Sequence, residues 1–375
     1  MKMLARLVFL VCSMGFSALG EDLTITSFSG NGTLTWAYPT NGVTNYRVEW
    51  ASPADGTYTN FDGAAAMLNT IVPTGATMTA TLPITDAEVQ MFYFYRVVAT
   101  ATNPPAPAGM VLIPGGTNAG TNPLVDGETY GPAYYPATYS LTVPSFYMDK
   151  HEVTKALWDE VYAWAITNGY GFDNAGSGKA TNHPVHTVNW YDAVKWCNAR
   201  SQQEGRQPVY TVNGAVYMAG QSNDVVQTSA VGYRLPTDVE WEYAARGGAA
   251  SRRYPWTDSD EIQHARANYF STNSFSYDTS PTRRYHPAYS NAPVPYTSPV
   301  GSFAANGYGL HDMAGNVWER CFDWYPGFEG TYRVFRGGGF DSRANACRVG
   351  LRFYGRPDLA PYYSYGFRTV LPPDQ

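Results

Sequence analysis

The feature that most constrains this fold is a long run, residues 109–372, in which signals for regular secondary structure are sparse. Gly, Pro and Tyr punctuate the run, and it contains no internal repeat. Loops longer than about 15 residues are uncommon in ordinary domains. We therefore expect a loop-rich domain whose loops are held by aromatic packing, buried polar contacts or bound ions.

Three helices stand out within this run. Thr154 is placed to cap the first, and Trp190 opens the second. Thr237 and Glu240 form a capping box for the third, which Gly247 is placed to close. The apolar stripes comprise Leu157, Val161, Trp164 and Ala165 in the first helix, and Trp190, Ala193, Val194 and Cys197 in the second.

Residues 21–104 have a different character and predict a small all-β domain. Short β-branched and aromatic segments alternate with Gly, Pro, Asn and Asp, and Tyr46, Val48 and Trp50 alternate as on one face of a strand. The size, the early Trp36 and the Tyr-rich late strand resemble a fibronectin type III sandwich. Residues 105–108, rich in Pro and Ala, are predicted to form a semi-rigid linker to the domain at 109–372.

Residues 1–20 have the pattern of a signal peptide. Lys2 and Arg6 precede a short apolar stretch, and Ala18 to Gly20 offer small residues for cleavage. A buried first strand is the alternative. The signal predicts a secreted or periplasmic protein, and no later apolar run is long enough to span a membrane. The net charge of −6 gives no reason to expect nucleic acid as a partner.

Oxygen ligands for a hard cation occur in the segment Gly315–Glu319, which reads GNVWE. An amide oxygen, a carboxylate and turn carbonyls within five residues suit Ca²⁺. An ordinary turn with a solvated Glu319 is the alternative. His183 and His186 are spaced for a metal pair, but no third soft ligand is near in sequence.

Several strings together resemble the sulfatase-modifying-factor family, the formylglycine-generating-enzyme-like domains. They include FYMDKHEVTKALW, HPVHTVNWYDAVKWCNA, YRLPTDVEWEYAARGG, PVGSFAANGYGLHDMAGNVWER, RGGGF and GFRTV, and they cover about residues 109–372. The resemblance implies an α+β fold, C-type-lectin-like and poor in regular structure, that holds Ca²⁺. It strengthens the ligand set Gly315, Asn316, Val317 and Glu319, and suggests Asn268 with the Tyr269 carbonyl as a second site.

The same resemblance implies an oxidase site, but this chain departs from it at three places. Active members bind Cu(I) with two cysteines five residues apart. Here Cys347 matches the second cysteine, and Ser342 stands in place of the first. Thiolate sulfur selects Cu(I), and a hydroxyl is a poor substitute. In addition, Gly339 replaces a serine and Arg320 replaces a second tryptophan of the same centre.

Two chemical states are therefore predicted for Cys347. Neighbouring arginines favour a thiolate, which would make Cys347 the surviving copper ligand and catalytic residue if the oxidase were active. Alternatively, Cys347 pairs with Cys321, because the family resemblance brings their two loops together and export favours disulfides. We favour the Cys321–Cys347 disulfide. Cys197, on an apolar helix stripe, is expected to be an inert thiol.

These observations predict an exported, calcium-stabilised binding or accessory module that has lost the copper oxidase site. The alternative is a formylglycine-generating oxidase, with Cu(I), acting on a cysteine of an exported sulfatase. The expected ligand is a protein, peptide or glycan. The Tyr-rich stretch from Arg343 to Tyr365 suits ligand contact, with core packing as the alternative. Its tyrosines are Tyr354, Tyr362, Tyr363 and Tyr365.

Overall fold

The computed structural model describes residues 106–373, apart from 125–128, 130, 132–133, 292 and 361, and the backbone of seven strands before them. The chain divides into two compact units, Met1–Pro104 and Pro105–Asp374. The predicted signal peptide and linker residue 105 lie outside the described residues. No described helix has the length and apolar character needed to cross a membrane.

The first unit contains two antiparallel sheets among its described residues. One has the order β1-β2-β6-β5 and the other β4-β3-β7. The alternating segment Tyr46–Trp50 lies in β3, which pairs with β7 along seven residues. The assignment of this unit as a fibronectin type III domain remains a prediction. The strands are β1 Ile25–Phe28, β2 Thr33–Ala37, β3 Asn45–Ala51, β4 Tyr58–Asn60, β5 Val72–Thr74, β6 Thr77–Thr81 and β7 Phe94–Thr100.

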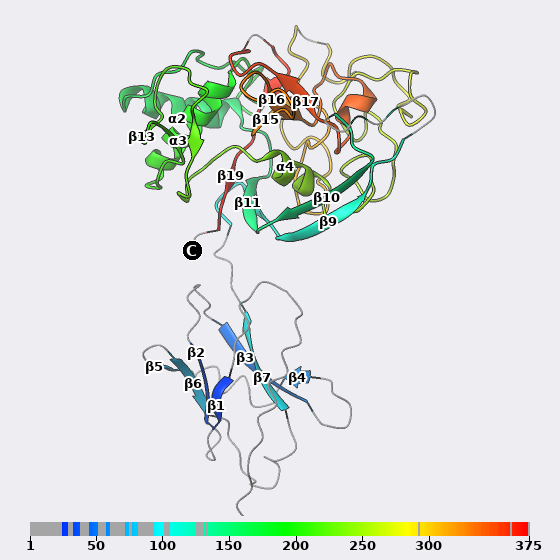
Figure 1. Cartoon of the computed structure of the whole chain (residues 1–375). Coiled ribbons are helices and arrows are strands. Elements are labelled where there is room, and N and C mark those ends of the chain that lie inside the picture. The colour runs from blue at the N-terminus through cyan, green and yellow to red at the C-terminus, as the bar shows by residue number, and fades with distance from the viewer. Residues whose placement is uncertain are drawn as a thin grey trace, which may run out of the picture. The chain divides into compact units, whose positions relative to one another are not determined.

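The described residues of the second unit form short strands, three α-helices and long loops (Figure 1). Its first and last strands meet in one sheet of order β19-β11-β8, so the two ends of the unit close on each other. The elements are β8 Met110–Ile113, β9 Gly116–Thr121, β10 Thr138–Val143, β11 Phe146–Asp149, α2 Lys155–Thr167, α3 Trp190–Gln203, β12 Tyr210–Val212, β13 Ala215–Val216, β14 Val226–Gln227, α4 Asp238–Ala245, β15 Trp318–Trp324, β16 Arg333–Arg336, the 3₁₀ turn η3 Ala344–Cys347, β17 Phe353–Gly355, β18 Tyr365–Gly366 and β19 Val370–Leu371.

The three predicted helices are present, and the caps of α2 and α4 follow the sequence signals. The Thr154 hydroxyl accepts from the Leu157 amide at 3.1 Å at the start of α2. Thr237 and Glu240 form the capping box of α4, and Gly247 follows that helix with φ +57°. α3 has a capping box that we did not predict, made by Asn189 and Asp192.

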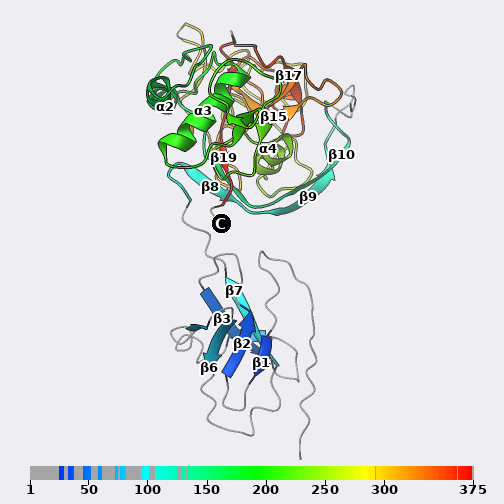
Figure 2. The ribbon, with the colours of Figure 1, turned by 60° about the vertical axis from the view of Figure 1, so that its left-hand side comes forward.

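The buried face of α2 differs from the predicted stripe. Trp158 is completely buried, whereas Leu157 and Trp164 are only half-buried. The Trp158 indole stacks on Trp196 of α3 with ring centroids 5.9 Å apart, because the two helices pack side by side (Figure 2). A large aromatic core therefore lies between α2 and α3. Aromatic packing of this kind was expected to hold the loops of a domain with little regular secondary structure.

A four-stranded sheet of order β17-β16-β15-β18 positions the candidate site. β15 pairs antiparallel with β16 and parallel with β18. Side chains alternate across β15, so Trp318 and Arg320 face one side and Glu319 and Cys321 the other. Both faces are buried. Of the residues at which the chain departs from an oxidase site, Arg320 lies on β15, and Gly339 and Ser342 lie between β16 and η3.

Candidate functional site

Cys347 ends the turn η3 and is enclosed on every side. Its sulfur lies against the Gly338 backbone, where an added Cβ would be 2.7 Å from Sγ. The thiol is fully buried in a cluster with Tyr254, Tyr269 and Tyr277. Burial, and then the charges of Asp341 and Asp278, raises the pKa of Cys347. The site therefore stabilises a neutral thiol.

The expectation that arginine neighbours would favour a thiolate at Cys347 was wrong. Arg336 donates to Asp238 at 2.6 Å and to Glu242 at 2.9 Å. Arg352 donates to the same Asp238 at 2.6 Å. The Arg348 guanidinium lies 3.9 Å from the Tyr135 ring centroid. Nearness in sequence does not place these cations around the sulfur, because carboxylates and aromatic rings elsewhere hold them.

The predicted Cys321–Cys347 disulfide is not present in the structure. Cys197, Cys321 and Cys347 are all free and buried. Cys321 points from β15 into a cluster with Trp241 and Val334, whereas Cys347 belongs to the separate tyrosine cluster. The alternation of side chains along β15 decides this, because Cys321 shares its face with Glu319 and that face packs on α4.

Ser342 does not present a free hydroxyl to Cys347. Its Oγ accepts a hydrogen bond from the Gly339 amide at 3.0 Å, and its carbonyl accepts from the Phe270 amide at 2.8 Å. At Gly339 an added Cβ would approach the Ser364 Cβ to 3.0 Å and the Asp341 Oδ1 to 3.1 Å. A serine side chain at 339 would therefore require these neighbours to move.

Arg320 is buried on the opposite face of β15 from Cys321. Its Nη2 donates to the Val188 carbonyl at 2.8 Å and to the Leu359 carbonyl at 2.7 Å. Its guanidinium lies 4.6 Å from the Phe335 ring centroid. Burial lowers the pKa of Arg320 to about 10. A cation thus occupies a region that is otherwise aromatic and apolar.

The residues of the two predicted calcium sites lie on two segments, around Asn268 and around Asn316, that contact each other directly. The Asn316 amide donates to the Asn268 carbonyl at 2.8 Å, and the Ser298 amide donates to Asn316 Oδ1 at 2.9 Å. Gly315 has φ +87°, and an added Cβ would lie 2.3 Å from that same Asn268 carbonyl. The Tyr269 carbonyl is 3.1 Å from His264 Nε2. Asn268 Oδ1 is buried and has no hydrogen-bond partner.

Glu319, the carboxylate of the predicted set, is already paired with a cation. Arg368 Nε donates to Glu319 Oε2 at 2.6 Å and Arg368 Nη2 to Oε1 at 2.7 Å. The Trp241 indole donates to Oε2 at 2.7 Å. All three side chains are fully buried. This bidentate pair ties the GNVWE turn to the GFRTV string near the C-terminus.

Sequence reasoning missed a buried carboxylate pair, Glu152 and Asp312. Both oxygens of Glu152 and Oδ1 of Asp312 are buried without hydrogen-bond partners. Asp312 Oδ2 accepts from the Gly301 amide at 2.6 Å. Burial, and then the charge of Asp312, raises the pKa of Glu152, and burial raises that of Asp312 to about 6. Both residues lie inside the strings that resemble the family, but they are 160 positions apart, and no local pattern indicates that they are neighbours.

The unpartnered oxygens of Glu152 and Asp312 fit a hard cation such as Ca²⁺, which selects oxygen ligands. Asp312 leads directly into the turn Gly315–Val317 of the predicted set, and both Asp312 and Asn316 have positive φ. No cluster of three His, Cys, Asp or Glu side chains suited to a metal occurs in the described residues. An ion here would therefore need amide or carbonyl oxygens as well. His183 and His186 instead contact the hydroxyls of Thr297 and Thr187.

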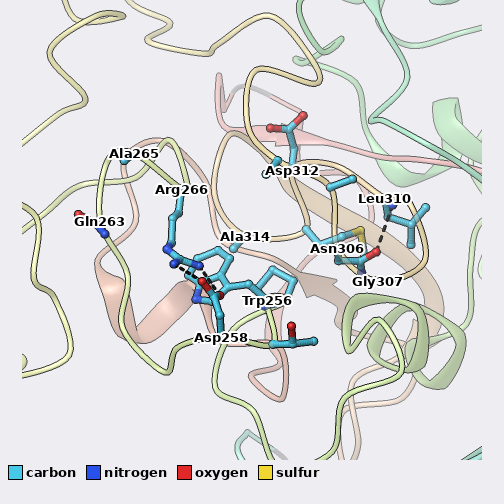
Figure 3. Close-up of a pocket in the computed structure, with 15 residues that line it drawn as sticks. Trp256, Asp258, Gln263, Ala265, Arg266, Asn306, Gly307, Leu310, Asp312 and Ala314 are labelled. Atoms are coloured by element: carbon cyan, nitrogen blue, oxygen red, sulfur yellow. Dashed lines mark hydrogen bonds and ion pairs between the residues drawn. The ribbon is translucent and has the colours of Figure 1, made fainter.

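A cavity of about 520 Å³ lies between the loops around Trp256 and Asn306 (Figure 3). Arg266 forms a bidentate pair with Asp258 at 2.7 and 2.6 Å. The Trp256 ring stacks on Tyr254, and the Arg266 guanidinium lies 5.3 Å from its centroid. In Figure 3 the Asp312 carboxylate points away from this pair. The polar groups near Trp256 are thus largely satisfied by one another.

The tyrosines predicted to contact a ligand divide into two groups. Tyr354, Tyr362 and Tyr363 are 43%, 48% and 50% exposed, whereas Tyr365 is 9% exposed and packs on Phe335. Tyr363 meets the His186 ring edge-on at 5.6 Å, and Tyr354 is parallel to the exposed Phe328. The C-terminal segment therefore presents aromatic rings at its surface above a packed aromatic layer.

The loop-rich fold and the site around Gly337–Cys347 define a formylglycine-generating-enzyme-like domain. Residues 95–372 match the family described as the sulfatase-modifying factor enzyme 1-like domain. The chain belongs to this family, which confirms the resemblance carried by the ordered strings.

The relatives of this chain include proteins that are named for different functions. The chaperone protein LppX of Paenibacillus barcinonensis is 33% identical over 227 residues, covering 56% of this chain and 74% of LppX. The formylglycine-generating enzyme of Thermomonospora curvata is 30% identical over 280 residues, 68% of this chain and 76% of the enzyme. The crystal structure of CarF superimposes with a TM-score of 0.55 and 28% identity, covering 72% of this chain and 99% of CarF.

Proposed function

We propose that this protein is an exported binding or accessory module of the sulfatase-modifying factor family, stabilised by calcium and without the two-cysteine copper oxidase. Export rests on the signal-peptide pattern of residues 1–20. The accessory role is supported by a relative that is named a chaperone and not an oxidase. The ligand would be a protein, peptide or glycan, with an exported sulfatase among the protein candidates.

The observation that carries the proposal is the state of Cys347. It is a single buried thiol with a raised pKa, and the hydroxyl at Ser342 is occupied by the Gly339 amide. Copper(I) requires soft thiolate ligands. One protonated thiol beside a serine supplies neither the second sulfur nor the negative charge that Cu(I) needs. The segment is therefore poorly suited to bind copper.

The oxidase alternative is tested with a sulfatase peptide that contains Cys-x-Pro-x-Arg. The full chain, incubated with Cu(I) and oxygen, is expected to leave the peptide cysteine unchanged in mass spectrometry. The Thermomonospora curvata enzyme serves as the positive control. Ser342→Cys, which restores the second thiol, is expected to raise copper binding. Conversion of the peptide by the unaltered chain would overturn the proposal and establish an enzyme.

The binding role is tested at Tyr362 and Tyr363. The full chain is screened against immobilised glycans, a peptide library and sulfatases, and saturable binding to one class is expected. The double variant Tyr362→Ala, Tyr363→Ala is expected to weaken that binding at least about tenfold, as for aromatic anchors. Ile166→Ala, which truncates an equally exposed side chain on α2, is the control. Equal affinities of the double variant and the control would contradict the assignment of this surface.

The calcium part of the proposal assigns Glu152 and Asp312 as the carboxylate ligands. Their unpartnered buried oxygens support it, as does the position of Asp312 four residues before Asn316. A bound Ca²⁺ supplies charge that offsets the repulsion of two buried carboxylates. Asn268 Oδ1 is a further unpartnered oxygen of the predicted set. Glu319 is left to its pair with Arg368.

A further inference from the structure

Arg320 is a fully buried cation whose charge is offset only in part, at a distance, by the Asp192 carboxylate. Its exposed fraction is 0%. Its hydrogen bonds go to two backbone carbonyls, and no carboxylate of the described residues lies within ion-pair distance. Its Nε and Nη1 are buried and have no hydrogen-bond partner. Two of its three nitrogens are therefore unsatisfied within the core.

Three of the other fully buried arginines of the described residues are compensated by a carboxylate. Arg336, Arg368 and Arg246 each pair with a buried glutamate or aspartate. Arg333 lacks an acidic partner and has one buried nitrogen, Nε, without a hydrogen-bond partner, but it lies between two tryptophan rings, 3.7 Å from the Trp190 centroid and 3.3 Å from that of Trp324. Arg320 has Phe335 at 4.6 Å and, farther away, Tyr365 at 5.9 Å.

Arginine keeps its proton in folded proteins, so Arg320 does not escape the cost of burial by becoming neutral. A buried charge is stable only when it is paired, and an unsatisfied buried donor needs a partner that is a side chain, a water or an ion. A water molecule would satisfy one donor without neutralising the charge. An anion beside Nε and Nη1 would do both.

We propose that Arg320 binds a small monovalent anion, a halide or a carboxylate of the size of acetate, at Nε and Nη1. The anion is a free ion and not part of a larger ligand, because Arg320 is fully buried. An anionic group attached to a larger molecule could reach Arg320 only if the chain that covers it opened. Through Nη2, Arg320 also joins Val188 to Leu359. The anion would thus stabilise the segment that leads to Tyr362 and Tyr363.

Thermal unfolding of the full chain tests the proposal. The midpoint is measured in sodium chloride, in sodium acetate and in the sodium salt of a bulky morpholine sulfonate, at equal ionic strength and pH. A ligand that binds only the native state raises the midpoint with its concentration. We expect chloride or acetate to raise the midpoint by several degrees over the sulfonate, which does not fit.

Arg320→Met is expected to abolish the difference between anions, and Arg333→Met, the matched buried arginine, is expected to keep it. Equal midpoints of the unaltered chain in all three salts, or a difference that persists in Arg320→Met, would overturn the proposal. If Arg320→Met does not fold, crystals of the unaltered protein grown in bromide decide. An anomalous peak beside Arg320 Nε or Nη1 supports the site, and its absence while other bromide peaks are present refutes it.

Discussion

At the scale of single residues, burial and not sequence neighbours determines the chemistry of the cysteines. Burial is the main cause that raises the pKa of Cys197, Cys321 and Cys347. For Cys321 the nearby Asp238 adds to the effect. Arg336 lowers it again, but burial outweighs this one favourable charge. Each thiol therefore behaves as a small apolar side chain.

We expect all three of these cysteines to resist alkylation by iodoacetamide in the native protein at pH 8, because the reactive thiolate is scarce and shielded. Peptide mapping by mass spectrometry, with and without denaturant, provides the measurement and identifies each position. Unfolding should make all three reactive without prior reduction. Rapid native labelling of Cys347, or its recovery in a disulfide, would show that this description of the thiol is wrong.

The pair Glu319–Arg368 is the second residue-scale prediction. Glu319→Gln keeps the shape of the side chain but leaves Arg368 buried without its charge partner. Breaking a buried ion pair in this way costs roughly 3–5 kcal/mol of unfolding free energy. Denaturant unfolding measures the loss. Asp258→Asn, which breaks the exposed pair with Arg266, is the control and should unfold almost as the unaltered chain does.

At the scale of elements, the turn before β15 depends on a close approach of two backbones. Gly315 has φ +87° and lies against the Asn268 carbonyl, which accepts the Asn316 amide. Gly327 and Gly330 also have positive φ, but an added Cβ would meet nothing within 4 Å at either position. A comparison of Gly327 with Gly315 therefore distinguishes the cost of positive φ from the cost of the close contact with Asn268.

We therefore expect Gly327→Ala to cost about 1 kcal/mol, the price of positive φ alone. Gly315→Ala should cost a further ~1–3 kcal/mol, because the added methyl group breaks the buried hydrogen bond to Asn268. Urea unfolding of the two variants in parallel gives the difference. Equal losses of stability would mean that the two backbones separate without penalty and that the turn does not require the contact.

At the scale of the whole molecule, the loops of residues 106–373 are held by polar groups as well as by the core. If Glu152 and Asp312 bind Ca²⁺, excess chelator should lower the thermal midpoint, since the ion binds only the native state. The double variant Glu152→Gln, Asp312→Asn removes the repulsion and the charge together, so chelator should have little effect on it. Elemental analysis of the purified protein gives an independent measurement. A midpoint insensitive to chelator, in protein that contains no calcium, would exclude the site.

Much of the fold and part of the site could be predicted without coordinates. The capping signals at Thr154 and Thr237 located two helices because a cap is a local interaction between residues three apart. The ordered strings identified the family, and Ser342 in place of a cysteine is evident from the chain alone. The buried face of α2 was predicted less well, since Trp158 is buried by its partner Trp196 on another helix.

The available groups follow from the sequence alone: three helices and the caps of two of them, a family, one cysteine where an oxidase has two, and an arginine in place of a tryptophan. How those groups are used depends on the folded arrangement of the chain. It pairs Glu319 with Arg368 across 49 positions and turns Cys321 away from Cys347. It also leaves Glu152, Asp312 and Arg320 with buried, unpartnered atoms. The physical reason is that pKa, ion pairing and hydrogen-bond satisfaction depend on distance and burial, which segments far apart in the chain supply to one another.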